Sequence, residues 1–360
     1  MSQNPKFKQL SAVEFDATVS ANDLCMAFGL ILTYQKKSLK HFIMPNGAEM
    51  VVNLSRNEAC VPTSNIIWQP SQLAREMKLI NGEENFSSAL EMIESFYNSI
   101  ESNPVSFPYS VVSSPVHHLT DNTRIQDRDL TLLMNRMGIS KNIGDFYGIE
   151  GSLPNIPSEG HKRVLAFPVY NESESYIAFD GKSWRQIGEA GMSTFHERRK
   201  DQVCMVYENI LDFLAMMEMV TKNGVAPILR SRFHLVTNGE RGLEATCQYL
   251  KSNPDFLEVK CLLSDRPEGR KIFRAIHEAT KGTAIDRKDL LGNYPSIVAK
   301  CQPKRPQYWQ TILIPEEPII KNEISNDVSQ QQAEKKLQEM VNQRETKTVV
   351  YNSKSGGLKM

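Results

Sequence analysis

Acidic side chains follow two apolar runs in the second half of the chain. The run V-C-M-V-Y leads directly into Glu208, and Asp212 follows one helical turn later. The run V-K-C-L-L is followed by Asp265 and then by Glu268. If both runs are parallel strands, these carboxylates lie at the same edge of one sheet. Carboxylates at such an edge suit Mg²⁺, which could orient a phosphoryl group and stabilise charge on its oxygens.

The elements that must position these carboxylates alternate along residues 201–286. Short apolar runs, typical of buried strands, are separated by helical patterns of ten or so residues. This alternation predicts an α/β fold with a mainly parallel sheet and helices on both faces. We expect its strands to end near Tyr207, Val236 and Leu263.

Composition divides the rest of the chain. We expect a smaller α+β amino-terminal domain, a linker rich in Pro and Ser, a helix followed by a strand-rich segment, the α/β domain and a mobile polar tail. The boundaries are residues 16–100, 101–120, 121–200, 201–300 and 321–360. Ser20 or Asn22 could cap a helix that ends at Gly29, and Gly138 should end another. Asp180 and Gly181 separate two alternating runs, which indicates a hairpin.

Three segments resemble the motifs of a known family. The run V-Y-E-N-I-L-D-F-L resembles the first Toprim motif, and L-L-S-D-R-P-E-G-R-K resembles the second. Between them, L-V-T-N-G-E-R-G-L is similar to the family's middle strand and turn. The chain resembles the Toprim-containing, primase-like proteins of Bacteroidetes mobile elements, which are related to bacterial DNA primase. The resemblance spans roughly residues 20–300 and is strongest over 201–290.

The resemblance implies roles for individual residues. Glu208 matches a catalytic acid/base or metal-bridging carboxylate, while Asn209 stands where the family has Gly. Ser264 and Arg266 occupy the positions of two metal-binding Asp residues, and Asp265 takes the position between them. A cation at that place disfavours a metal ion, so we expect Mg²⁺ binding to be weak or absent. A later Asp of the family corresponds to Asp286 or Asp289.

The cysteines give no sign of a zinc site. None of the six is at C-x-x-C spacing, and His41 with Cys60 cannot complete a tetrahedral set. We therefore expect the amino-terminal domain to fold without zinc. Cysteines inside apolar runs suit a reducing cytoplasm, and neither a signal peptide nor the ~20 apolar residues of a membrane span are apparent.

Nucleic acid would have to bind at a local patch. Lys plus Arg equals Asp plus Glu at 42 each, so net charge offers no general attraction. Candidate phosphate contacts are Arg198, Arg199, Lys200, Arg230, Arg270 and Lys271, although such charges can also form an ordinary solvated face. We expect weak, sequence-independent binding to single-stranded DNA or RNA that falls as salt rises. Tyr308 and Trp309 could stack on a base, but we expect them to pack against the α/β sheet.

Three hypotheses follow. In the first, the chain is a primase-like Toprim protein acting on nucleic acid in replication or transfer of a mobile element, with a degenerate metal site. In the second, it is an active Mg²⁺-dependent nucleotidyl transferase or nuclease. In the third, it is a non-enzymatic scaffold that binds replication or transfer proteins.

Overall fold

The computed structural model describes residues 7–79, 85–102, 111–113, 119–156, 160–170, 174–179, 184–196, 198–199, 202–225 and 232–314. Contacts divide the chain into two units, residues 1–312 and 313–360. The predicted tail, 321–360, lies outside the described residues. No helix within the described ranges is long and apolar enough to cross a membrane.

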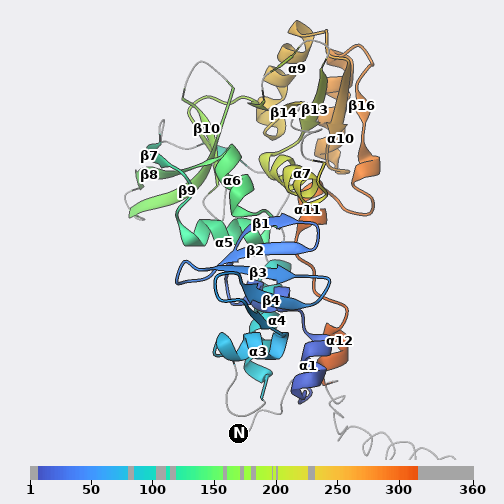
Figure 1. Cartoon of the computed structure of the whole chain (residues 1–360). Coiled ribbons are helices and arrows are strands. Elements are labelled where there is room, and N and C mark those ends of the chain that lie inside the picture. Colours follow the sequence, from blue (N-terminus) through green and yellow to red (C-terminus); the bar gives the residue numbers. More distant parts are fainter. Residues whose placement is uncertain are drawn as a thin grey trace, which may run out of the picture. The chain divides into compact units, whose positions relative to one another are not determined.

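The first sheet is an antiparallel meander near the amino terminus (Figure 1). Its strands are β1 (Ile31–Lys36), β2 (Leu39–Ile43), β3 (Glu49–Asn53), β4 (Glu58–Val61) and β5 (Ile66–Trp68). The helices of this region are α1 (Ala12–Thr18), α2 (Ala21–Ala27), α3 (Pro70–Glu76) and α4 (Ser87–Ser102). The Ser20 side chain caps α2 by accepting from the Asn22 N–H, and Gly29 follows the helix at φ +74°. Both ends of this predicted helix are therefore confirmed, with Ser20 as the cap.

The second sheet is the strand-rich segment expected after the linker. Its order is β6-β11-β10-β9-β8-β7. The strands are β6 (Val111–Ser113), β7 (Thr120–Thr123), β8 (Ile149–Ile156), β9 (Gly160–Pro168), β10 (Tyr176–Phe179) and β11 (Trp184–Ile187). Strands β10 and β11 pair antiparallel with Phe179 opposite Trp184, as expected for the predicted hairpin. Its turn, 180–183, lies outside the described residues. The predicted linker contributes β6, which pairs with β11.

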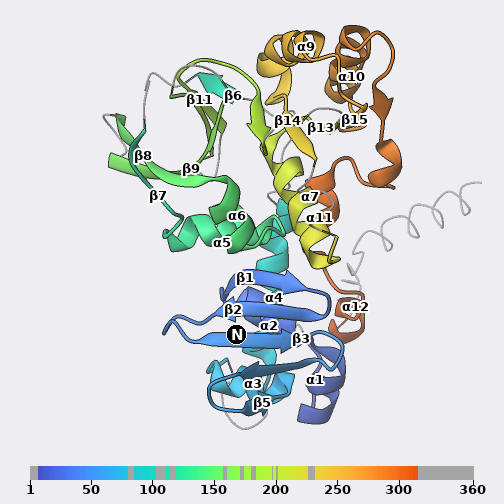
Figure 2. The ribbon, with the colours of Figure 1, turned by 45° about the horizontal axis from the view of Figure 1, so that its top comes forward.

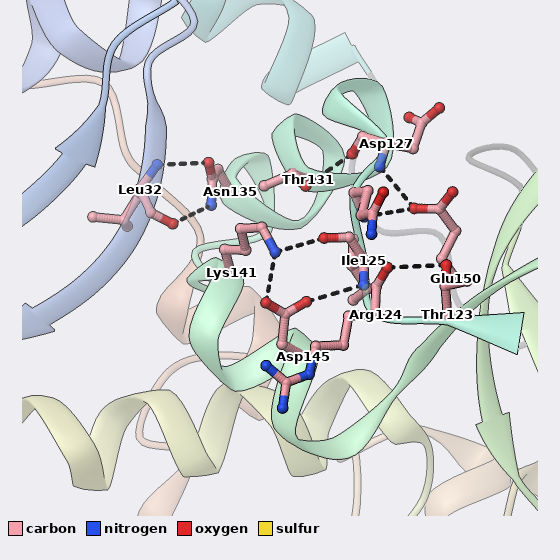
Figure 3. Close-up of polar contacts among 11 residues, drawn as sticks. Leu32, Thr123, Arg124, Ile125, Asp127, Thr131, Asn135, Lys141, Asp145 and Glu150 are labelled. Atoms are coloured by element: carbon pink, nitrogen blue, oxygen red, sulfur yellow. Dashed lines mark hydrogen bonds and ion pairs between the residues drawn. The ribbon is translucent and has the colours of Figure 1, made fainter. Parts of the chain in front are cut away.

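Two short helices, α5 (Arg128–Arg136) and α6 (Lys141–Tyr147), follow β7 in the chain and pack against β1 of the first sheet. Asn135 extends from α5 to the edge strand β1, where its Oδ1 accepts from the Leu32 N–H at 2.9 Å and its Nδ2 donates to the Leu32 carbonyl at 3.1 Å (Figure 3). Glu150 accepts from the N–H groups of Gln126 and Asp127 at the start of α5, both at 2.7 Å. Buried polar side chains thus satisfy backbone groups that no strand or helix pairs. Gly138, at φ +79°, follows α5 as predicted.

The third sheet is the α/β domain expected over residues 201–300. Its order is β12-β14-β13-β15-β16, with all neighbours parallel except the edge pair β12 and β14. The strands are β12 (Ser193–Phe195), β13 (Val203–Tyr207), β14 (Phe233–Val236), β15 (Glu258–Leu262) and β16 (Ile285–Asp286). The three predicted strand ends are confirmed to within one residue.

Helices cover both faces of this sheet, as predicted. The central strand β13 shows why: Val203, Met205 and Tyr207 pack on one side, while Cys204 and Val206 pack on the other. The first side carries α7 (Ile210–Lys222) and α11 (Ile297–Cys301), and the second carries α9 (Leu243–Ser252) and α10 (Pro267–Ala279). Two 3₁₀ turns, η1 (Gly239–Gly242) and η2 (Lys288–Leu290), complete the connections. A strand apolar on both sides is the expected consequence of burial between two helical layers.

The expected position of Tyr308 and Trp309 was wrong. The Tyr308 hydroxyl donates to Asp23 of α2 at 2.6 Å, and the Trp309 ring packs edge-on against Phe7 at 5.6 Å. Trp309 opens α12 (Trp309–Ile312) and is 2% exposed. Both aromatic residues therefore pack on the amino-terminal region. Sequence separation explains the error, because no local pattern indicates which apolar surface a Pro-broken segment will cover.

We predict that Trp309→Ala lowers the free energy of unfolding by about 3–5 kcal/mol, because it removes a buried indole from a packed contact. The measurement is urea denaturation of the full chain. Gln310→Ala, an exposed position in the same helix, is the matched control and should change stability by less than about 0.5 kcal/mol. Equal effects of the two substitutions would contradict the packing described for Trp309.

Candidate functional site

Glu208 joins the carboxyl ends of three parallel strands. It follows β13 and is 3% exposed. Its carbonyl accepts from the Thr237 Oγ1 at 3.0 Å and the Gly239 N–H at 2.9 Å, both just after β14. Its carboxylate Oε2 accepts from the Ser264 N–H at 3.0 Å, just after β15. Glu208 is therefore fixed from both sides, and one of its carboxylate oxygens already has a backbone donor.

Asp212 holds the amino terminus of a different helix. Its Oδ1 accepts from the Val298 N–H of α11 at 2.8 Å, and its Oδ2 accepts from the Asn209 Nδ2 at 2.9 Å. Asp212 is 1% exposed, and this burial, reinforced by repulsion from Glu208, raises its pKa to about 7. The two bonds favour the ionised form but do not offset the loss of water. Asp212 thus satisfies backbone and amide donors in the core.

Asp265 lies on the solvent side of the same edge. Its side chain is 57% exposed and pairs with Lys288 Nζ at 2.9 Å and more loosely with Arg270 at 3.9 Å. The bond from Lys288 and its charge lower the pKa of Asp265. Asp286, at the end of β16, also lies near Lys288, at 3.6 Å. Asp265 and Asp286 at this edge therefore both form ion pairs with Lys288.

Gly269 allows α10 to begin directly against the end of β15. A Cβ at this position would meet the Ser264 carbonyl oxygen at 2.2 Å, so any larger residue would displace the helix. Ser264 is 1% exposed, and its hydroxyl is buried with no hydrogen-bond partner among the described residues. This close approach places a free hydroxyl beside the first turns of α10.

A cavity of about 260 Å³ lies beside this hydroxyl. Its polar and charged lining consists of Ser264, Arg270, Arg274, Asp286 and Lys288, with Leu263, Gly269 and Phe273 as the remaining walls. Three cations thus face the cavity against one carboxylate. Such a lining favours an anion, and the partial positive charge at the start of α10 adds to that preference.

The proposed metal ligands Asp212, Asp265 and Glu268 were expected to share one site with Glu208. Glu268 lies in the first turn of α10 and is half-buried. Within the described ranges, no group of three or more His, Cys, Asp or Glu side chains is arranged to hold a metal ion. Asp289 pairs with Arg287 at 2.6 Å, whereas Asp286 lines the cavity. The role of these carboxylates as metal ligands stays a prediction.

The predicted basic patch is divided between two edges of the sheet. Arg198 pairs with Asp255 and lies 5.1 Å from the Phe256 ring, just before β13 and β15 begin. Arg270 and Lys271 lie at the carboxyl edge. A five-residue strand, which separates the two edges, is about 17 Å long. Lys271 pairs with Glu240 at 2.9 Å. Arg199 is exposed, and Lys200 and Arg230 lie outside the described residues.

Sequence reasoning missed Arg274 and Lys288. Arg274 follows Arg270 by four residues, so the two share one helix face, and this spacing was visible in the sequence. Lys288 has no such signal, because the pairing of β15 with β16 brings it to the edge.

His41 and Cys60 lie on β2 and β4, and His41 Nδ1 is 2.6 Å from Glu49 Oε1. The expectation of folding without zinc stays a prediction.

Comparisons with known proteins add a fold similarity at low identity. No family model and no curated protein sequence matches the chain. The crystal structure of the primase fragment of the bacteriophage T7 primase-helicase protein is similar over 75% of this chain and 93% of that one, at 10% identity and a TM-score of 0.35. A chain in the structure of bacteriophage T7 lagging-strand DNA polymerase interacting with primase domains matches over 48% and 91%, at 15% identity and a TM-score of 0.27. At these values, neither similarity assigns a function to this chain.

We predict that Asp212 makes the protein less stable as pH rises from about 4 to about 7. Its folded pKa of about 7 lies above the ordinary value of 3.8, so the folded chain retains a proton that the unfolded chain has lost. The free energy of unfolding falls by on the order of a few kcal/mol, and the full decrease is reached above the folded pKa. Asp212→Asn keeps an acceptor for the Val298 N–H and removes the titration.

Urea denaturation of both proteins at about pH 5 and about pH 7.5 measures this effect. The variant should gain stability relative to the natural chain at the higher pH, because contributions from all other groups cancel in the comparison. Asp265→Asn is the control, since Asp265 is exposed and its lowered pKa places its titration below this window. Parallel pH profiles for the natural chain and Asp212→Asn would show that Asp212 titrates normally.

Proposed function

We propose that this chain is a primase-like, Toprim-type protein that binds single-stranded nucleic acid during replication or transfer of a mobile element, and that its metal site is degenerate. One observation carries the proposal. At the carboxyl edge of the parallel sheet, where the resemblance implies a metal, a buried Ser264 hydroxyl with no partner among the described residues lies beside a cavity lined by three cations and Asp286. Such an edge suits a phosphodiester without a bridging ion.

The cavity fits phosphate chemistry in three ways. Arg270 and Arg274 lie on one face of α10 and can donate to phosphate oxygens in a fork geometry. Lys288 supplies a third positive charge from the opposite wall. The Ser264 hydroxyl can donate to an oxygen that enters the cavity, which would satisfy a buried group now without a partner. Backbone contacts of this kind are independent of base sequence, in agreement with the expected lack of specificity.

The same residues fit a resident Mg²⁺ poorly. Glu208 and Asp212 use carboxylate oxygens to accept backbone donors, and Asp265 is paired with Lys288. Any ion here would compete with those donors and would lie close to Lys288 and Arg270. These contacts support nucleic-acid binding over the second hypothesis, a Mg²⁺-dependent nucleotidyl transferase or nuclease. Replication or transfer proteins remain the proposed partners.

We predict that Arg270→Glu combined with Arg274→Glu weakens binding to single-stranded DNA by about tenfold or more at low salt. Each lost phosphate contact should also reduce the slope of log affinity against log salt by about 0.7. The measurement is fluorescence anisotropy of a labelled oligonucleotide across a salt series. Both positions are exposed on α10, so the variant should fold, which circular dichroism checks.

Lys251→Glu is the matched control, because it reverses one exposed charge at the far end of α9. Arg198→Glu combined with Arg199→Glu tests the other edge of the sheet. Loss of binding in that variant alone would move the interface to the amino edge and overturn the cavity assignment. Absence of binding by the natural protein at low salt would instead favour the scaffold hypothesis.

We predict that the natural protein binds Mg²⁺ or Mn²⁺ only at millimolar concentrations or not at all. Ser264→Asp combined with Arg266→Asp should strengthen binding by roughly tenfold or more, because it adds two carboxylates beside Glu208 and removes a permanent cation. Isothermal titration calorimetry of both proteins is the measurement. Micromolar binding by the natural protein, abolished by Glu208→Gln, would establish the enzyme hypothesis.

A further inference from the structure

A second and larger cavity lies at the carboxyl end of helix α7. Its volume is about 430 Å³, and it is walled by α2 and β1 on one side and by α7 and the segment after α11 on the other. Both views show the last turns of α7 beside α11 and β1 (Figure 1, Figure 2). Lys222 ends α7 about 18 Å along the helix axis from Ile210. No residue lining this cavity also lines the one at Ser264.

Positive charge dominates the walls of this cavity. Among the described residues, its charged lining consists of Lys40, Lys222, Lys300, Lys304, Asp23 and Glu218. Three of the lysines are held by uncharged partners. Lys40 Nζ donates to the Asn22 Oδ1 at 2.8 Å, Lys300 Nζ donates to the Leu290 carbonyl at 2.8 Å, and Lys304 Nζ lies 3.4 Å from the centre of the Tyr294 ring. Their charges therefore remain available to a ligand.

The two acids of the cavity are engaged elsewhere. Asp23 accepts from the hydroxyls of Tyr97 and Tyr308 at 2.9 and 2.6 Å. Glu218 accepts through Oε2 from the N–H and the hydroxyl of Ser140 at 2.9 and 2.7 Å. Burial raises the pKa of both carboxyl groups. The electrostatic balance of the cavity favours an anion.

Two buried polar atoms at this cavity have no partner. Gln35 and Glu218 are each 5% exposed, and the Gln35 Nε2 and the Glu218 Oε1 make no hydrogen bond with any described residue. Both residues line the cavity. One is a donor and the other an acceptor, and each costs free energy unless a ligand or water satisfies it. Because Ser140 fixes Glu218 through Oε2, the orphaned oxygen has a defined position.

Apolar side chains form the remaining wall. Met26, Leu32 and Met219 line the cavity beside the Tyr97 ring. A flat heterocycle could pack on such a surface while its polar edge pairs with the Gln35 amide and the Glu218 carboxylate. Nucleobases offer donors and acceptors together on one edge, which inorganic phosphate lacks. The lysines would then hold the charged end of the same molecule.

We propose that this cavity, lined by Lys40, Lys222, Lys300, Lys304, Gln35 and Glu218, is a binding site for a nucleoside phosphate. The site is separate from the carboxyl edge of the parallel sheet and does not depend on the function proposed for that edge. Its ligand is recognised at one end by charge and at the other by hydrogen bonds from buried, pre-positioned groups.

Isothermal titration calorimetry of the full chain with ATP, GTP and inorganic phosphate tests the proposal. At least one nucleotide should bind with a Kd below about 1 mM and at least tenfold more tightly than phosphate. Lys40→Met should weaken that binding by about tenfold, and Gln35→Leu should weaken nucleotide binding without changing phosphate binding. Lys36→Met is the matched control. Lys36 is next to Gln35 on β1, but it is exposed and does not line the cavity.

A pH series provides a second readout. Desolvation and the neighbouring Lys222 lower the pKa of Lys40 to about 8, against the opposing charges of Asp23, Glu218 and Cys25. Lys40 is therefore roughly nine-tenths protonated at pH 7 and about one-tenth at pH 9. Because Lys40 loses its positive charge, nucleotide affinity should fall across this range. The fall should be smaller in Lys40→Met.

If Lys40→Met fails to fold by circular dichroism, Lys222→Ala replaces it, because Lys222 is an exposed lysine of the same cavity. Nucleotide binding that survives both lysine substitutions would overturn the proposal. Equal affinity for phosphate and both nucleotides would overturn the nucleoside assignment. Absence of binding at about 1 mM would show that water satisfies Gln35 and Glu218.

Discussion

The bonds of Glu208 hold together the edge on which the rest of the α/β domain depends. Its carbonyl receives donors from the turn after β14, and its carboxylate receives the Ser264 N–H after β15. Three strand ends thereby share one residue. Because Glu208 is buried, removing its carboxylate would leave the Ser264 N–H unsatisfied, at a cost of about 1–3 kcal/mol. Glu208 therefore acts as a structural acceptor at this edge.

The same edge combines a close helix approach with a cluster of cations. Gly269 brings α10 against the end of β15, where a Cβ would meet the Ser264 carbonyl oxygen. Asp265 is paired with Lys288 at this point, and the cavity is lined by Arg270 and Arg274. A cation fixed in the protein performs part of the role of a bound metal, because both attract phosphate oxygens.

Local patterns in the sequence predicted most of the fold. The apolar run of β13 indicated a strand buried on both faces, and the cap at Ser20 and the turn at Gly138 marked helix ends, because each depends on neighbouring residues. The features that escaped prediction depend on residues far apart in the chain. Asp212 accepts from Val298, which is 86 positions away, and Tyr308 donates to Asp23, 285 positions away. Neither pair has a spacing that a periodic pattern could reveal, so the bond from the Val298 N–H to the Asp212 carboxylate could not be predicted from the sequence.

Helix α7 extends from the carboxyl edge of the parallel sheet to the cavity lined by Gln35 and Glu218. Asp212 in its first turn and Glu218 near its end are both buried, and each accepts from backbone groups of another segment, Val298 and Ser140 respectively. Most of the helix is also buried in the apolar core, including Phe213, Met216 and Met217. A helix packed on this many sides moves as a rigid body or not at all, because a dense interior resists small displacements. The positions of Glu218 at this cavity and of Asp212 at the sheet edge are therefore set by the same core, and a change in packing along α7 would alter both.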